Sequence, residues 1–175
     1  MPSVAFLRAV NVGGANRCQP AAIAKDLARF GLVNIGAVGT FVVRENVSAS
    51  VLRAALARKL SFPCEIMICP GRDLLKLAAK DPFSEQPSGP KVTRFVSVLA
   101  RRPHTPPTLP LRLPSENDWL LKIIALQGRF LLGVYRREMK AISYLAKIEK
   151  QFGVAATTRN WNTIEKVVKA LQADA

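Results

Sequence analysis

Histidine and cysteine are scarce in this sequence, and their scarcity restricts the chemistry that it can support. The chain of 175 residues has one histidine, His104, and three cysteines, Cys18, Cys64 and Cys69. Catalytic Ser-His-Asp or Cys-His relays and multi-histidine metal sites need histidine held by neighbouring groups, but His104 lies in a proline-rich segment. The cysteines lack a zinc-type spacing, so we interpret them as reduced, structural residues. We therefore predict no metal or other cofactor and assign no catalytic residue.

Long apolar runs are also missing. Charged residues interrupt every apolar segment, and none approaches the roughly 20 apolar residues that a membrane-spanning helix needs. Residues 1–8 run directly into a strand-like pattern, without a basic region, an apolar stretch and a cleavage site in that order. These absences predict a cytoplasmic protein without a membrane segment.

Acidic residues are few compared with basic ones. The sequence has 26 Lys and Arg against 12 Asp and Glu, a formal charge of +14. Residues 1–88 have 11 basic and 6 acidic side chains (+5), and residues 89–175 have 15 and 6 (+9). Such a charge attracts anionic partners, although it also serves solubility. We expect nucleic acid or a small anionic ligand as the partner, and the sequence leaves the oligomeric state open.

The first half of the chain alternates between strand and helix patterns. Apolar alternation, glycine stops and serine caps define these elements. The expected strands are residues 4–10, 35–43 and 65–69, and the expected helices lie near residues 20–30, 50–60 and 71–80. The predicted order is therefore β-α-β-α-β-α.

The second half is predicted to contain strands followed by helices. A strand near residues 92–99 precedes a proline-rich connector, residues 101–118, which we expect to be extended and exposed. Gln127-Gly128 separates two strand-like runs and indicates a tight hairpin. Two helices follow, and on the first of them one broad apolar side is expected to be buried. Its members are Met139, Ile142, Leu145, Ala146, Ile148 and Phe152. The predicted order is β-β-β-α-α, and the fold class is α+β.

Three segments carry a resemblance to a known family. Residues 7–14 read Leu-Arg-Ala-Val-Asn-Val-Gly-Gly, and residues 157–163 read Thr-Thr-Arg-Asn-Trp-Asn-Thr. Both resemble signatures of the domain-of-unknown-function family 1697, and residues 81–83, Asp-Pro-Phe, are similar to its Asn-Pro-Phe element. The resemblance extends over the full length. It implies two ferredoxin-like or intertwined α/β subdomains, residues 1–88 and 89–175, but no reaction.

The chain departs from the family pattern at one place. Where the family usually has Gln-Ser-Gly-Asn-Val, residues 37–42 read Ala-Val-Gly-Thr-Phe-Val, and only the glycine is retained. If the polar side chains serve a site in relatives, the resemblance implies that this site is altered or lost here.

Gly13 and Gly14 form the first candidate ligand site. Glycines between a strand and a helix expose backbone N–H groups that bind phosphate, and Arg8, Asn11, Asn16 or Arg17 could add contacts. The segment lacks the third glycine of a dinucleotide fingerprint and the Gly-Lys-Ser/Thr of a P-loop. A plain turn between strand and helix is the alternative interpretation.

Arg159, Asn160 and Trp161 form the second candidate. Together with Asn162, they place a cation, two amides and an aromatic face beside a predicted helix start, a combination that suits a base or an anionic ligand. The alternative is a structural helix cap with a half-buried tryptophan.

Four cations, Arg136, Lys140, Lys147 and Lys150, form the candidate nucleic-acid site. They collect on one side of the predicted helix and would suit contacts to a phosphate backbone. A solvated helix face is the alternative interpretation.

Three functions follow from these patterns. The favoured one is binding of nucleic acid or another anionic ligand. An enzyme acting on a small, phosphate-bearing metabolite is the alternative, and it requires the two ligand-site candidates to converge on one pocket. A partner-binding module is the third, and it predicts a contiguous exposed apolar patch.

Overall fold

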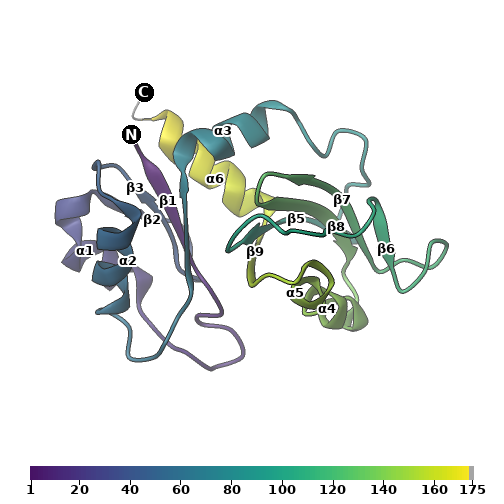
Figure 1. The fold of residues 1–175 in the computed structure, drawn as a ribbon, viewed down its shortest axis with the longest axis horizontal. Coiled ribbons are helices and arrows are strands. Elements are labelled where there is room, and N and C mark those ends of the chain that lie inside the picture. The colour runs from purple at the N-terminus through teal and green to yellow at the C-terminus, as the bar shows by residue number, and fades with distance from the viewer. Residues whose placement is uncertain (174–175) are drawn as a thin grey trace. The chain divides into compact units, whose positions relative to one another are not determined.

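The structure, a computed structural model, describes residues 1–173. It is α+β and has one four-stranded and one five-stranded sheet, both antiparallel. The chain divides into two compact units: unit 1 is Met1–Lys80 with Asn162–Ala175, and unit 2 is Asp81–Trp161. The last helix, drawn yellow in Figure 1, therefore returns almost wholly to unit 1. No helix of the described residues is both long and apolar enough to span a bilayer.

Unit 1 contains the four-stranded sheet. The strands follow the order β2-β3-β1-β4, and each neighbouring pair is antiparallel. Its elements are β1 (Ser3–Leu7), α1 (Pro20–Asp26), the 3-10 helix η1 (Ala28–Phe30), β2 (Leu32–Asn34), β3 (Thr40–Val43), α2 (Ala49–Ala57), β4 (Ile66–Pro70), α3 (Gly71–Ala79) and α6 (Trp161–Gln172).

Local signals explain the helix ends in unit 1. Pro20 begins α1, where its missing N–H costs nothing. The backbone N–H of Val51 donates to Ser48 Oγ at 3.3 Å and caps α2. Gly31 ends η1 in the left-handed conformation. Apolar residues of α1 and α2 then pack on one face of the sheet, which fixes both ends of the loop between β1 and α1. The buried members of this cluster are Ala5, Leu7, Val10, Ile23, Leu27, Phe41, Val43, Leu52, Ala55, Leu56 and Ile66.

Unit 2 contains the five-stranded sheet, in the order β6-β7-β8-β5-β9. Phe95 and Leu121 on the sheet pack with Ile148 and Phe152 of α5 in one buried cluster. The elements are β5 (Val92–Leu99), β6 (Leu111–Leu113), β7 (Leu121–Gln127), β8 (Phe130–Arg136), α4 (Met139–Leu145), α5 (Ile148–Phe152) and β9 (Ala156–Asn160). A two-residue turn after Gln127 joins β7 to β8, so the predicted hairpin is confirmed with its turn one residue later.

The predicted order of elements differs from the observed one. Residues 35–43 were expected as one strand, but the chain forms β2 and β3 with a turn around Gly36 and Gly39, both at positive φ. The connector, residues 101–118, was expected to be exposed, but it contains the paired strand β6, and Pro103 is buried. Residues 156–160 form β9 because they pair with β5. Strand pairing across the sequence, which local patterns do not encode, decides each of these cases.

The predicted long helix after β8 is two short helices. It breaks near Ala146 and Lys147, between α4 and α5. Three of its expected core residues are on the surface: Met139 is 91% exposed, Ile142 is 64% exposed, and Ala146 is exposed too. The helical periodicity crosses the break, so the predicted apolar side is wrong for these three residues.

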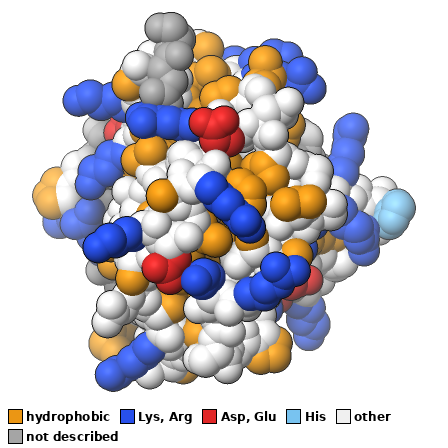
Figure 2. Space-filling model, turned by 90° about the vertical axis from the view of Figure 1, so that its left-hand side faces the viewer, with side chains coloured by type: hydrophobic (Ala, Val, Ile, Leu, Met, Phe, Trp, Pro, Cys, Tyr) orange, Lys and Arg blue, Asp and Glu red, His pale blue; other side chains and the backbone are white. Residues whose placement is uncertain are grey.

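The basic charge is shared equally between the two units. Each has 13 Lys and Arg against 6 Asp and Glu, a formal charge of +7. The excess assigned to residues 89–175 depends on a boundary at residue 88, whereas the compact units place residues 162–175 with unit 1. Lys and Arg side chains are spread across the face shown in Figure 2, with few Asp and Glu among them. Charge alone therefore selects neither unit as the binding site.

Candidate functional site

The loop between β1 and α1 has an unusual backbone. Ala9, Asn11, Gly13, Gly14 and Asn16 all have positive φ, between 49° and 76°. Glycine adopts this left-handed region freely, and asparagine does so more readily than most residues. The loop thus contains four of the predicted ligand-site residues, and it curls back on itself through an isolated bridge between Val12 and Ala15.

Asn11 holds the loop together. Its Nδ2 donates to the carbonyl of Cys18 at 3.0 Å and to that of Ala37 at 2.7 Å, while its Oδ1 accepts from the N–H of Cys18 at 2.9 Å. Its own N–H donates to the carbonyl of Asn16. The predicted Asn11 is therefore an organising residue that ties the loop to the turn before β3.

A hollow of about 590 Å³ opens beside this loop. The lining residues are Asn11, Gly14, Arg17, Cys18, Gln19 and Ala37. Arg17 supplies the only formal charge among these side chains, and its Nε donates to the carbonyl of Gly14 at 3.2 Å. The hollow is a cationic concavity without a lining carboxylate.

The loop also carries backbone donors, at the lining residue Gly14 and at its neighbour Gly13. The N–H groups of Gly13 and Gly14 make no hydrogen bond to any residue that the structure describes. Arg17 Nη2 lies 3.7 Å from the point that a Cβ at Gly14 would occupy, so the guanidinium and the glycine backbone are neighbours. Unpaired N–H groups in left-handed turns and a guanidinium are the donors that proteins use for oxyanions.

The Cys18 thiol adds no negative charge to the hollow. Its pKa is raised above the ordinary 9.0, first because of burial and second because of the nearby Cys64 thiol, while the hydrogen bond from Asn11 opposes the shift. The thiol is therefore protonated near neutral pH. This agrees with its interpretation as an unreactive cysteine.

Arg8 does not line the hollow. It follows β1, where its N–H donates to the carbonyl of Glu65 at 2.9 Å and its carbonyl accepts from Cys64 Sγ at 3.3 Å. These contacts fix the end of the strand from which the loop departs. Of the side chains predicted to add contacts here, Asn11 and Arg17 line the hollow and Arg8 and Asn16 do not, while Cys18, Gln19 and Ala37 complete the lining.

The second candidate site lies in unit 2, in β9 and at the start of α6. Arg159 is only 6% exposed, and its Nη1 donates to Thr157 Oγ1 at 2.8 Å and to the carbonyl of Thr158 at 3.0 Å. Asn160 is exposed at the strand end. Trp161 packs edge-to-face on Phe83 with ring centroids 5.0 Å apart, which joins two of the segments that resemble the family.

These contacts favour a structural role for this segment. The helix begins at Trp161, so these residues lie beside a helix start as predicted, but Arg159 and Asn160 belong to the strand β9. The loop candidates belong to unit 1 and this segment to unit 2, so their convergence on one pocket stays a prediction.

The predicted basic stripe does not lie on one helix. Arg136 ends β8, Lys140 is in α4, Lys147 lies between the helices, and Lys150 is in α5. Lys147 Nζ lies 4.7 Å from the ring centroid of Tyr144. All four are exposed, but the helix break removes the common face that suggested a phosphate-binding row.

A cationic surface that the sequence analysis missed surrounds Trp119. Arg136 Cζ lies 4.5 Å and Lys122 Nζ 4.9 Å from its ring centroid. Arg112 and Lys122 lie close to Trp119 in sequence and could have indicated this surface. Both lie in segments that were interpreted only as connector and strand.

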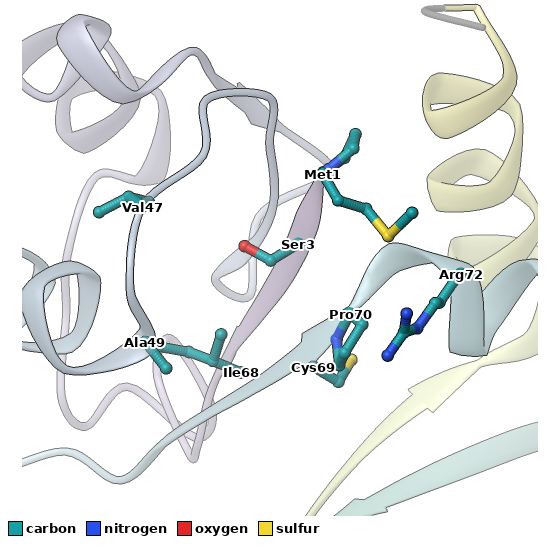
Figure 3. A pocket seen from close by; sticks show the side chains of 9 residues that line it. Met1, Ser3, Val47, Ala49, Ile68, Cys69, Pro70 and Arg72 are labelled. Carbon is teal, nitrogen blue, oxygen red and sulfur yellow. The ribbon is translucent and has the colours of Figure 1, made fainter.

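A second hollow in unit 1, of about 340 Å³, is largely apolar. The lining side chains that Figure 3 labels come from Met1, from β1 and β4, from the start of α3, and from the segment before α2 and its first residue. Arg72 is the charged side chain among them, and its Nε lies 3.9 Å from Asp73 Oδ1. With its guanidinium beside a carboxylate, this hollow is a weaker anion site than the loop. Within residues 1–173, no cluster of His, Cys, Asp and Glu could hold a metal ion.

Comparisons with known proteins identify the family but no activity. Residues 1–118 match the family described as a protein of unknown function (DUF1697), so the chain belongs to this family. A conserved bacterial protein of known structure, SP0830 from Streptococcus pneumoniae, is 17% identical, with a TM-score of 0.57 over 96% of this chain and 97% of that one. The likeness shows a shared fold. No curated protein matches the chain.

Proposed function

We propose that unit 1 binds a small, phosphate-bearing ligand in the hollow beside the β1–α1 loop. The observation that supports the proposal is the joint presence of two unpaired N–H groups, at Gly13 and Gly14, and the neighbouring Arg17 guanidinium. Asn11 holds these donors in place by hydrogen bonds to the backbone on both sides of the hollow.

The size and charge of the hollow suit such a ligand. Its volume of about 590 Å³ falls within the range of small-molecule sites. A tetrahedral oxyanion presents several acceptors, which matches backbone donors and a guanidinium held close together. The neutral Cys18 thiol causes no repulsion. Ala37, where the family usually has glutamine, leaves room for the ligand at one wall.

Calorimetric titration with inorganic phosphate and pyrophosphate tests the proposal. We expect both to bind the wild-type protein and Arg17→Ala to weaken binding about tenfold or more, because a charge-assisted hydrogen bond contributes about 1.5–3 kcal/mol. Arg58→Ala is the matched control, because it removes the same charge from the exposed end of α2.

Two results would contradict the proposal. Equal weakening by Arg17→Ala and Arg58→Ala would mean that phosphate responds to net charge only. The phenylalanine ring of Ala37→Phe would fill part of the hollow. If this variant still bound phosphate as tightly as the wild-type protein, the ligand would bind elsewhere. Circular dichroism of each variant checks that the fold is retained.

We also propose that unit 1 is a ferredoxin-like subdomain. The support is its element order, β1-α1-β2-β3-α2-β4, combined with the antiparallel order β2-β3-β1-β4. This arrangement puts α1 and α2 on one face of the sheet and leaves the β1–α1 loop at the end of a central strand. A solved structure of unit 1 with a different strand order would overturn this assignment.

A further inference from the structure

Trp119 lies next to two cations in unit 2, just before β7. Lys122 Nζ is 4.9 Å and Arg136 Cζ is 4.5 Å from the centroid of its ring. The N–H of Arg136 donates to the carbonyl of Leu120 at 2.9 Å, which fixes the backbone beside the ring. An aromatic ring with an adjacent guanidinium plane is a surface on which nucleobases stack.

The strand register gathers more positive charge on the same side of the sheet. Arg112 of β6 is directly opposite Lys122 of β7, and Lys122 is opposite Val134 of β8. Opposite residues of antiparallel strands share a face, and Arg136, two residues after Val134, shares it too. Arg112, Lys122 and Arg136 therefore form one cationic surface with Trp119, which we name the Trp119 surface.

This arrangement is unfavourable for the protein without a partner. Like charges directly opposite each other on neighbouring strands destabilise a sheet. The pKa of Lys122 is lowered, mainly by burial and further by Arg112. Glu116 Oε2 lies 2.8 Å from Arg112 Nη1, but this carboxylate is 71% exposed, so the pair contributes little. A bound polyanion would relieve the repulsion.

We propose that the Trp119 surface binds single-stranded nucleic acid. A base stacks on Trp119 and the Arg136 guanidinium, and Arg112 and Lys122 contact the flanking phosphates. A lipid surface fits less well, because the exposed large hydrophobic residues, among those the structure describes, all lie outside this surface. Duplex DNA fits less well, because its bases are stacked on each other and their flat faces are not accessible.

Tryptophan fluorescence gives a direct readout, because the chain contains only Trp119 and Trp161. In the Trp161→Phe variant, which keeps an aromatic ring against Phe83, Trp119 is the only tryptophan. We expect an oligonucleotide of about 12 nucleotides, as oligo(dT) or oligo(U), to quench its emission, because stacking brings a base onto the ring. Binding without quenching would overturn the stacking arrangement.

Charge-removing variants test the phosphate contacts. We expect Lys122→Gln and Arg136→Gln each to weaken binding about tenfold and to reduce the slope of log affinity against log salt by about 0.7, the value for one phosphate contact to a single strand. Arg102→Gln, an exposed arginine of the same unit, is the control and should change affinity less than threefold. Comparison of the DNA and RNA oligomers shows whether the 2′-OH contributes.

Competing surfaces are separated by two further measurements. The triple variant Lys140→Gln, Lys147→Gln and Lys150→Gln removes the helical cations and should leave quenching intact. Loss of binding in this variant but not in Lys122→Gln would overturn the inference in favour of α4 and α5. Equal affinity for duplex DNA or heparin would overturn it in favour of unselective charge attraction. Arg17→Ala should have no effect, so this inference and the phosphate site fail independently.

Discussion

The two units have equal formal charge but present it in different ways. In unit 1, Arg17 and the backbone of Gly14 line a hollow, and Asn11 organises the loop that carries them. In unit 2, cations lie along neighbouring strands beside an aromatic ring. A concave site suits a small anion, whereas a row of side chains on a sheet suits an extended one. The local arrangement of donors, more than net charge, therefore indicates the partner.

We expect the largest effect on stability from a substitution of Gly133, a closely packed glycine in strand β8 of the five-stranded sheet. A Cβ at Gly133 would overlap the Phe95 ring and come 2.8 Å from the carbonyl of Lys122. We expect Gly133→Val to lower the free energy of unfolding by about 3 kcal/mol or more, because the crowding involves backbone as well as a buried ring. Urea denaturation measures the change, with the exposed Ala100→Val as control. Similar stability of the two variants would contradict the packing described for unit 2.

Arg159 tests whether a buried cation of unit 2 is structural. Arg159→Met removes the guanidinium hydrogen bonds to Thr157 and Thr158. We expect a loss of about 2–3 kcal/mol in unfolding free energy, because these bonds involve a charged donor. Phosphate affinity, measured by calorimetry on the folded variant, should stay within twofold. A normal stability with lost phosphate binding would instead make Arg159 a ligand-binding residue.

Asn11 tests the organisation of the loop in unit 1. Asn11→Ala removes its side-chain hydrogen bonds and puts alanine at a φ of 54°. We expect a loss of about 1–2 kcal/mol in unfolding free energy and a phosphate affinity at least tenfold lower, because the donors are no longer held together. Asn16→Ala, in the same loop, loses one long hydrogen bond to Ala9 and should have a smaller effect on stability. Equal effects would contradict the organising role of Asn11.

We expect the smallest effect on stability from Cys18, whose contribution depends on pH. Its folded pKa is above its ordinary value of 9.0, so the fold favours the neutral thiol. The resulting stability is fully present below the unfolded pKa and is lost as pH rises through the folded one. Alkylation by iodoacetamide, followed by mass spectrometry, should be slow near neutral pH and accelerate only above about pH 9. Rapid alkylation of Cys18 at neutral pH would show a reactive thiolate in the hollow.

Local patterns predicted the elements whose signals are local. The serine cap of α2, the glycine stop after η1 and the β7–β8 hairpin each depend on a few neighbouring residues. Each is confirmed, at Ser48, at Gly31 and after Gln127. The strand β9 and the return of residues 162–175 to unit 1 depend on contacts far apart in sequence. The periodicity of residues 139–152 failed because it crossed the break between α4 and α5.

The candidate sites, like the fold, could be predicted from sequence only where they depend on neighbouring residues. The glycines and asparagines of residues 11–16 are identifiable from sequence because these residue types tolerate left-handed backbone. Residues 37–42 are identifiable only as a departure from the family pattern. The place of Ala37 in the hollow was not predictable, because it is set by a hydrogen bond from Asn11, 26 positions earlier. Trp119 was missed for the same reason, since β8 supplies Arg136 to its ring from 17 positions away.

An NMR titration of the ¹⁵N-labelled protein with inorganic phosphate tests the central claim most directly. The account predicts saturable amide shifts at Gly13 and Gly14, a shift of the Arg17 side-chain Nε–H, and little change at Lys122 and Arg136. Shifts spread over both units without saturation, or no shift at the two glycines, would contradict a built anion site in unit 1.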